Sequence, residues 1–317
     1  MADPIAALLK QRLIVVTGKG GVGKTSLAAS LALRAAAEGR RVGLFEMSHT
    51  EALAPLFGHP PVAMAETRVR ERLFIANLDP KACFERFVLR SLKSKTLYRL
   101  LFSNRLVDSF IQAIPGLDSL LVLAELLEAA EWRGERRGVE PPYDLVILDA
   151  PATGHGLTLI NTPRNLMTML GSGPIHSLAR RVFDRLADPA FTSLQVVTLP
   201  EEMPVTETIE LIEGVDPELK LHWAPVLVNQ VLEGELDEAR LEAVRGALSR
   251  RAGTTPIVEA LTARVQRECA QQAQVARLRE TIPLPVHTLP RIAGLGDARD
   301  ALAAFGELLC HLRNSSD

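Results

Sequence analysis

The sequence contains few cysteines, few aromatic residues and no excess of charge of either sign. Cys83, Cys269 and Cys310 lie far apart and no CxxC pair occurs, which excludes a cysteine-rich zinc or iron–sulfur site within one chain and is typical of a reduced compartment. The 36 Lys and Arg residues nearly balance 38 Asp and Glu residues. A nucleic-acid or anionic-membrane partner is not expected, because phosphate-rich surfaces select strongly basic faces. Aromatic residues make up only 4%, so no stacking platform for single strands is expected.

Long hydrophobic runs are also missing. The most apolar stretch, Leu117–Ala130, is interrupted by Asp118, Glu125 and Glu128. No run approaches the roughly 20 apolar residues that span a bilayer, so no integral membrane segment is expected. The first residues do not resemble a secretory leader. These features together predict a cytoplasmic protein of ordinary globular composition.

Short aliphatic runs alternate with helical patterns along the whole chain. Continuous apolar strands that alternate with helices predict a parallel sheet covered on both faces, which is a doubly wound α/β fold. No break in composition divides the sequence, so residues 1–317 are interpreted as one domain. The predicted strands are Leu13–Val16, Arg41–Phe45, Leu73–Asn77, Leu145–Leu148, Leu194–Thr198, Pro225–Val228 and Pro283–Val286.

Two stretches between strands contain more helix than a simple crossover needs. In the first, helices are predicted over Asn104–Ile114 and Leu117–Trp132, with Pro115-Gly116 as the breaker. In the second, a helical stretch runs from Leu157 to about Leu186. We expect a helical subdomain, built from approximately residues 80–132 and 157–190, over one edge of the sheet.

A glycine-rich segment, GKGGVGKT, joins the first strand to a predicted helix over Thr25–Glu38. It matches the P-loop pattern GxxxxGK[ST] in its strand–loop–helix context, which disfavours a glycine-rich turn without nucleotide. Backbone N–H groups and the helix dipole would surround the phosphates of ATP. Lys24 would reach the β- and γ-oxygens, and Thr25 would ligate Mg²⁺. The predicted contacts are Gly18, Lys19, Gly20, Gly21, Val22, Gly23, Lys24, Thr25 and Ser26.

An aspartate, Asp149, ends the buried run LVIL and begins the sequence DAPATGH. An aspartate at the end of a buried strand is placed to hold a water on the P-loop magnesium, which is the Walker B role.

The second lysine of the loop, Lys19, makes it a deviant Walker A motif. In this feature the chain resembles the SIMIBI class of NTPases, which includes the ArsA and guided-entry ATPases, MinD, ParA and the nitrogenase iron protein. The resemblance implies an ATP-bridged dimer in which Lys19 points at the partner's nucleotide. The alternative is a solvated lysine.

Several further motifs resemble the ArsA/guided-entry family in particular. The residues Thr153-Gly154-His155 match the end of its switch II signature, DTAPTGH, which MinD and ParA lack, although Ala150–Ala152 depart from it. Ile114–Asp118 is similar to the family's PGIDE element, and Pro200–Thr208 is similar to the stretch after the next strand. The chain is identified as a member of the short bacterial branch of this family, over nearly its whole length.

The same resemblance implies the residues that hold the base. Asn229 follows a strand, as the family's adenine-reading asparagine does. Pro290 and Arg291 occupy the place of the loop that packs on adenine.

Switch I departs from the family pattern. The family sequence STDPAH contains an aspartate that orients the attacking water, whereas this chain has FEMSHTE at Phe45–Glu51. An ungapped count places Ser48 at the aspartate's position, and a two-residue deletion would align Glu46 with it. Three alternatives stay open: Glu46 positions the water, His49 or Glu51 does, or the ATPase is slow and has no dedicated base.

Two specialisations of relatives are not expected here. No cysteine lies between Asp149 and Leu199, which disfavours the arsenite site of the pump subunit, and the CxxC zinc site of the eukaryotic targeting factor is absent. Met167 and Met169 could line a reduced groove for a hydrophobic client, although apolar residues at helical spacing are more often core.

The sequence therefore predicts a dimeric, Mg²⁺- and ATP-binding switch ATPase that uses Lys24, Lys19, Glu46 and Asp149. Its partner would be a second copy or a paralogous ATPase, and a hydrophobic protein client is possible. A scaffold that binds ATP with little turnover and a positioning ATPase similar to ParA or MinD are the alternatives. The client and its pathway are not predicted.

Overall fold

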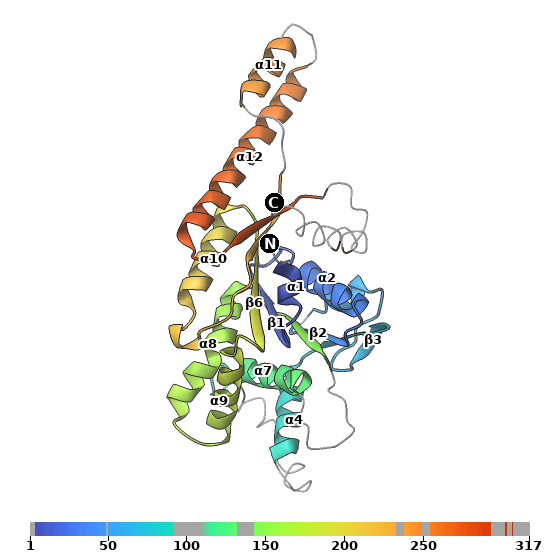
Figure 1. Ribbon diagram of the computed structural model, residues 1–317, viewed down its shortest axis with the longest axis vertical. Helices are drawn as coiled ribbons and strands as arrows, with labels where there is room; N and C mark the ends of the chain where they lie inside the picture. Colours follow the sequence, from blue (N-terminus) through green and yellow to red (C-terminus); the bar gives the residue numbers. More distant parts are fainter. Residues whose placement is uncertain are drawn as a thin grey trace.

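The computed structural model describes residues 4–48, 50–91, 111, 113–131, 143–232, 238–248, 254–292, 302 and 306. Over these residues, eight strands form one sheet in the order β3-β4-β2-β5-β1-β6-β7-β8 (Figure 1). The strands are β1 Leu13–Thr17, β2 Val42–Glu46, β3 Thr67–Arg70, β4 Leu73–Asn77, β5 Leu145–Asp149, β6 Thr192–Thr198, β7 Val226–Val231 and β8 Val286–Pro290.

Helices cover both faces of this sheet (Figure 1). Their bounds are α1 Pro4–Leu8, α2 Lys24–Ala37, α3 Leu53–Leu56, α4 Pro80–Ser91, α7 Leu117–Ala130, α8 Thr153–Leu170, α9 Pro174–Leu186, α10 Glu202–Gly214, α11 Glu238–Leu248 and α12 Thr255–Thr281, with a short 3₁₀ helix at Pro217–Leu219. Every strand pair among the described residues is parallel except β3–β4. The predicted doubly wound α/β fold is confirmed.

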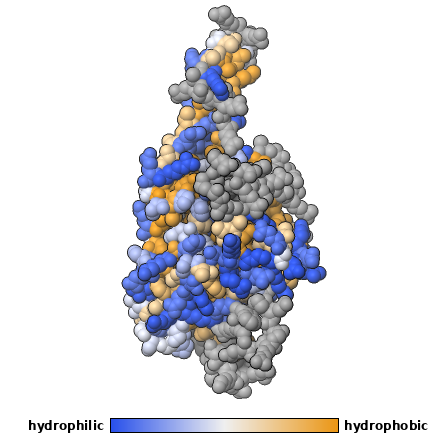
Figure 2. All heavy atoms as spheres, in the orientation of Figure 1, coloured by the Kyte–Doolittle hydropathy of each residue, from blue (hydrophilic) through white to orange (hydrophobic). Residues whose placement is uncertain are grey.

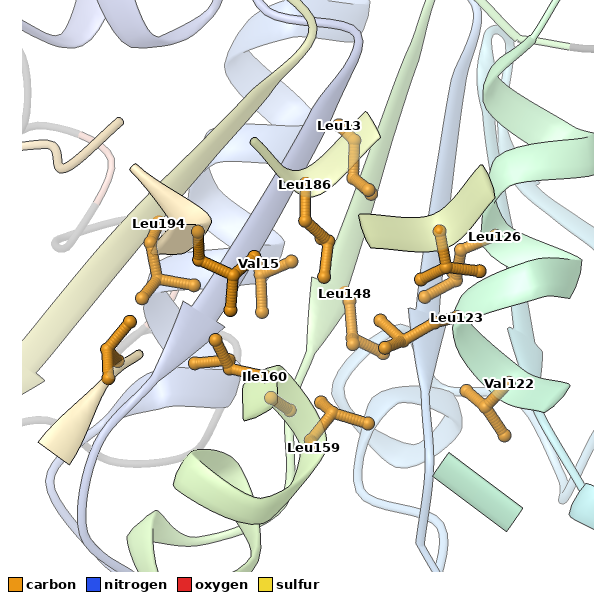
Figure 3. Close-up of a cluster of buried hydrophobic side chains, with 14 of the residues drawn as sticks. Leu13, Val15, Val122, Leu123, Leu126, Leu148, Leu159, Ile160, Leu186 and Leu194 are labelled. Atoms are coloured by element: carbon orange, nitrogen blue, oxygen red, sulfur yellow. The ribbon is translucent and has the colours of Figure 1, made fainter. Parts of the chain in front are cut away.

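Two hydrophobic cores lie on opposite faces of the sheet. Residues of α1, α2 and α3 fill one of them, and residues of α7, α8, α9 and α10 fill the other. In the second core, side chains of β1 and β5 meet those of three helices (Figure 3). The labelled residues at this contact include Leu13, Val15, Leu148, Leu123, Leu126, Leu159, Ile160 and Leu186.

The helix after the glycine-rich loop, α2, follows directly from its composition. It is rich in alanine and leucine, which have high helix propensity. Leu27, Leu31 and Ala35 recur every four residues and are fully buried against the sheet. Gly39, with φ 90°, adopts the left-handed conformation that commonly follows a helix end.

The observed elements differ from the sequence interpretation, or add to it, at three places. The helical stretch predicted from Leu157 to about Leu186 consists of two helices, because Gly171 and Gly173 turn the chain with φ of 62° and 106° between α8 and α9. The last strand begins at Val286 rather than Pro283, since proline has no N–H for the ladder and pairing starts only after Pro285. The antiparallel edge strand β3 was not predicted.

The helices nearest the C-terminal end were also not anticipated. The 27-residue helix α12 packs on α10 and β7 at its C-terminal half, where Val275 and Leu278 are buried. Figure 1 shows α11 and the outer half of α12 projecting beyond the sheet, and Figure 2 shows hydrophobic and hydrophilic side chains mixed over this projection. The helix predicted over Asn104–Ile114 falls almost wholly outside the described residues.

The central position of β5 predicts a large cost for truncation within it. We expect Leu148→Ala, at a fully buried position, to lower the free energy of unfolding by about 2–5 kcal/mol, because it removes apolar contacts and leaves a cavity. Met203→Ala, at a side chain that is 62% exposed, should change it by less than about 0.5 kcal/mol. Chemical denaturation monitored by circular dichroism would measure both values, and equal effects would contradict the assignment of the core.

Candidate functional site

The glycine-rich loop lies at the carboxyl edge of the sheet, between the central strand β1 and helix α2. Strand β1 has β5 on one side and β6 on the other, and the chain builds the sheet first on one side of β1 and then on the other. Such a switch point is where α/β sheets bind ligands. Gly18 has φ 146°, and a Cβ there would lie 2.1 Å from the carbonyl oxygen of Val197 at the end of β6. Only glycine therefore lets the loop leave β1 at this angle.

Parallel pairing places Asp149 beside the end of β1, in register with Val16. The hydroxyl of Thr25, in the first turn of α2, donates to Asp149 Oδ2 at 2.5 Å. The Nζ of Lys24 donates to the carbonyl oxygen of Lys19 at 2.9 Å, and so lies within the loop. Sequence reasoning proposed these residues from separate motifs, and the fold brings them together. Ser26 follows Thr25 in the first turn of α2.

Burial controls the electrostatics at this point. Burial raises the pKa of Asp149, while the hydrogen bond from Thr25 and the charge of Lys24 oppose the rise. Burial also lowers the pKa of Lys24, and the nearby Asp149 carboxylate opposes that change. The pair therefore presents one cationic and one anionic group in surroundings that solvate neither of them fully.

The donor set at this point fits a magnesium ion. Asp149 Oδ1 is buried and has no hydrogen-bond partner among the described residues, although the other oxygen of the same carboxylate is bonded to Thr25. A buried carboxylate oxygen without a partner is costly unless a cation or water satisfies it. Hydroxyl, carboxylate and water oxygens are the ligands that Mg²⁺ prefers.

Switch I places Glu46 at the end of β2, in register with both Asp149 and Asn77. The Glu46 carboxylate is buried and accepts N–H bonds from Ala52, at 2.9 and 3.2 Å, and from Leu53, at 3.2 Å. It thus caps the N-terminal end of the short helix α3. Burial raises the pKa of Glu46, the two backbone N–H donors lower it, and the nearby Asp149 charge adds to the rise.

The other described switch I residues bond to neighbouring segments. Ser48 is clamped by Asn77, which accepts from the Ser48 N–H at 3.1 Å and donates to its carbonyl at 2.8 Å. The Glu51 carboxylate accepts N–H bonds from Val62 and Ala63 at 2.6 and 2.8 Å. His49 lies outside the described residues. Sequence reasoning missed Asn77, because an asparagine ending a strand carries no motif of its own.

Asn229 contacts the P-loop directly. Its side-chain amide is buried, donates to the carbonyl oxygen of Val22 at 2.9 Å and accepts from the N–H of Gln230 at 2.9 Å. The fit leaves no room for a side chain on the loop, since a Cβ at Gly23 would lie 2.5 Å from Asn229 Nδ2. Asn229 therefore braces the loop whether or not it also reads a base.

The remaining predicted residues lie at the end of β8, directly after it, and along α8. Pro290 is the last residue of β8, and the N–H of Arg291 donates to the carbonyl of Val231 at 2.8 Å. Thr153, Gly154 and His155 form the first turn of α8. On the same helix, Met167 is half-buried against the core, whereas Met169 is 54% exposed, so the two methionines lie in different environments.

The profile of the anion-transporting ATPase family, ArsA_ATPase, matches residues 11–180 of this sequence. The chain belongs to this family. The match includes the glycine-rich loop, switch I, Asp149 and the TGH turn, so the family predicted from these motifs is confirmed. Membership of an ATPase family indicates nucleotide binding.

Proteins similar to this chain include bacterial, archaeal and protist ATPases. The ATPase BagA of Mycobacterium tuberculosis is 31% identical over 231 residues, which cover 71% of this chain and 67% of that protein. The ATPase ASNA1 homolog 1 of Paramecium tetraurelia is 31% identical over 156 residues, covering 49% and 44%. A putative arsenical pump-driving ATPase 2 of Aquifex aeolicus is 26% identical over 162 residues, covering 50% and 52%.

None of the helices described is both long and apolar enough to cross a bilayer. Over the same residues, no three His, Cys, Asp or Glu side chains gather as a metal-binding group. A metal at the P-loop would therefore depend on Thr25, Asp149 and the ligands that a nucleotide brings.

The unsatisfied carboxylate predicts that this site costs stability. We expect Asp149→Asn to raise the free energy of unfolding at neutral pH by about 1 kcal/mol, because it removes a buried charge with an unpartnered oxygen. The native pKa of Asp149 is raised, so its stabilising protonated form is lost as pH rises. The gain should therefore disappear as pH falls toward the ordinary aspartate pKa.

Denaturation of wild type and variant across this pH range would measure the effect. Asp184→Asn, on the exposed side of α9, removes the same charge without burial and serves as the control. A variant that is less stable than wild type at neutral pH would contradict the strain assigned to Asp149.

Proposed function

We propose that this chain is a Mg²⁺-dependent switch ATPase that closes around ATP as a dimer. The observation that carries the proposal is the pairing of Thr25 with Asp149 beside the P-loop, with Asp149 Oδ1 buried and unpartnered. Mg²⁺ would be held by Thr25 and, through water, by Asp149, where it would neutralise phosphate charge. Lys24 would give up the Lys19 carbonyl for phosphate oxygens, which are stronger acceptors.

The proposal of a dimer rests on Lys19, the second lysine of the loop, and on membership of the family. The partner would be a second copy or a paralogous ATPase, and ATP would lie between the two facing loops. Helices α4, α7, α8 and α9 would form the output surface, since α8 begins at the TGH turn directly after Asp149. A loop that changes with the nucleotide would therefore move α8 first.

A hydrophobic protein client is the weaker part of the proposal. The large hydrophobic side chains that are exposed among the described residues are Leu89, Met169, Met203 and Ile257. They lie on four different helices, α4, α8, α10 and α12.

A second function is favoured by a specific observation. Both oxygens of Glu46 are occupied by backbone N–H groups, and an ungapped count places Ser48 at the position of the family's aspartate. An adaptor that binds ATP and scarcely hydrolyses it would have these features. Steady-state phosphate release separates the two functions, because only the ATPase turns over above the rate of Lys24→Ala.

ATP binding should depend on Lys24. We expect Lys24→Ala to remove Mg²⁺-dependent ATP binding in calorimetry while thermal unfolding stays close to that of wild type, since this lysine contributes charge to the loop rather than apolar contacts to the core. GTP should bind more weakly than ATP, because Asn229 lacks the NKxD context that reads guanine. Equal ATP affinity in the variant would refute the P-loop assignment.

Glu46 can be tested against a matched residue. If Glu46 positions the attacking water, Glu46→Gln should keep ATP binding and reduce phosphate release by about 100-fold. Asp79 also accepts a backbone N–H, from Ala82 at 2.8 Å, so Asp79→Asn removes a similar brace and should leave the rate within a few-fold of wild type. Equal losses in the two variants would mean that Glu46 is only a brace.

A further inference from the structure

The lysine expected to act on a partner is bound within its own chain. Lys19 Nζ lies 2.7 Å from Glu207 Oε1, and the two side chains are 30% and 28% exposed. Glu207 belongs to α10 and to the stretch Pro200–Thr208, whose resemblance to the family has so far been given no role. Glu207 of the same chain thus competes with the contact that Lys19 would make across a dimer.

Helix α10 holds this carboxylate in a fixed place. Val205 and Ile209 flank Glu207 in sequence and are buried. The side chain of Arg277 in α12 donates to Thr206 Oγ1 at 3.1 Å, and Asn161 of α8 donates to the carbonyl of Gly214 at 2.9 Å. Because α10 is anchored to two other helices, the backbone that carries Glu207 stays in place, and the pair breaks by movement of the side chains.

We propose that Glu207 is a positioning residue that holds Lys19 at its own P-loop and so opposes the ATP-bridged dimer. The inference rests on the proposed function. On closure, Lys19 exchanges the Glu207 carboxylate for phosphate oxygens of the nucleotide on the partner. The lysine is a compact point charge that suits either anion, so the exchange needs no new donor. A two-fold dimer breaks two such pairs, and the effect counts twice.

The test is the dimer dissociation constant in saturating Mg²⁺ and a non-hydrolysable ATP analogue, measured by analytical ultracentrifugation. A half-exposed ion pair corresponds to roughly two-fold in an equilibrium constant, so Glu207→Gln should tighten the dimer about four-fold. Glu210→Gln, which removes the same charge from an exposed position of α10, should match wild type.

Two further readouts separate this role from a structural one. The difference between wild type and Glu207→Gln should shrink in 1 M salt, which screens the pair over about 3 Å. In the Lys19→Ala background, adding Glu207→Gln should no longer tighten the dimer. Analogue affinity at protein concentrations below the dimer constant should be equal in wild type and Glu207→Gln.

The outcomes distinguish the inference from the function beneath it. A wild type that dimerises with the analogue, together with a Glu207→Gln variant of equal or weaker dimer affinity, overturns the inference alone. A wild type that remains monomeric while the variant dimerises supports the inference in its strongest form. If both remain monomeric while binding the analogue, the proposed dimer and the inference fail together.

Discussion

The parallel pairing of β1 with β5 and of β5 with β2 is the constraint on which the site depends. Parallel strands end at the same edge, so the strand ends at Thr17, Asp149 and Glu46 lie side by side although more than a hundred residues separate Glu46 from Asp149. Burial of all three strands on both faces leaves their carboxyl ends as the place where polar side chains can gather. The hydrogen bond from Thr25 to Asp149 then joins the P-loop helix to this line.

The loop is braced on three sides by groups that do no chemistry themselves. Val197 lies so close that Gly18 cannot carry a side chain, and Asn229 binds the carbonyl of Val22 from β7. Lys19 reaches Glu207 on α10. Two of these segments also contact α12. Arg277 of α12 donates to Thr206 of α10, and the N–H of Leu232, after β7, donates to Gln271 of α12. The loop is therefore connected to α12 through both α10 and β7.

Switch I is the part of the site in which this member of the ArsA family differs most from the family pattern. The segment after β2 is held at both ends, by Glu46 at the start of α3 and by Asn77 of β4, which bonds to Ser48. A carboxylate that accepts backbone N–H groups loses freedom to approach a water molecule, since the same lone pairs serve both purposes. If Glu46 positions the water of the proposed ATPase, nucleotide binding would have to rearrange the segment around it.

The sequence by itself determined the family, the doubly wound sheet, and Lys24, Thr25 and Asp149 as a group. Apolar runs and the P-loop are local patterns, and local patterns survive without tertiary information. It did not determine the edge strand β3, the split between α8 and α9, or the start of β8, because turn geometry and pairing partners set those boundaries. Only the tertiary structure decided that Asn229 braces Val22, that Glu46 closes α3 and that Glu207 holds Lys19. The first and last of these contacts join segments far apart in the sequence, and for all three side-chain chemistry alone names no partner.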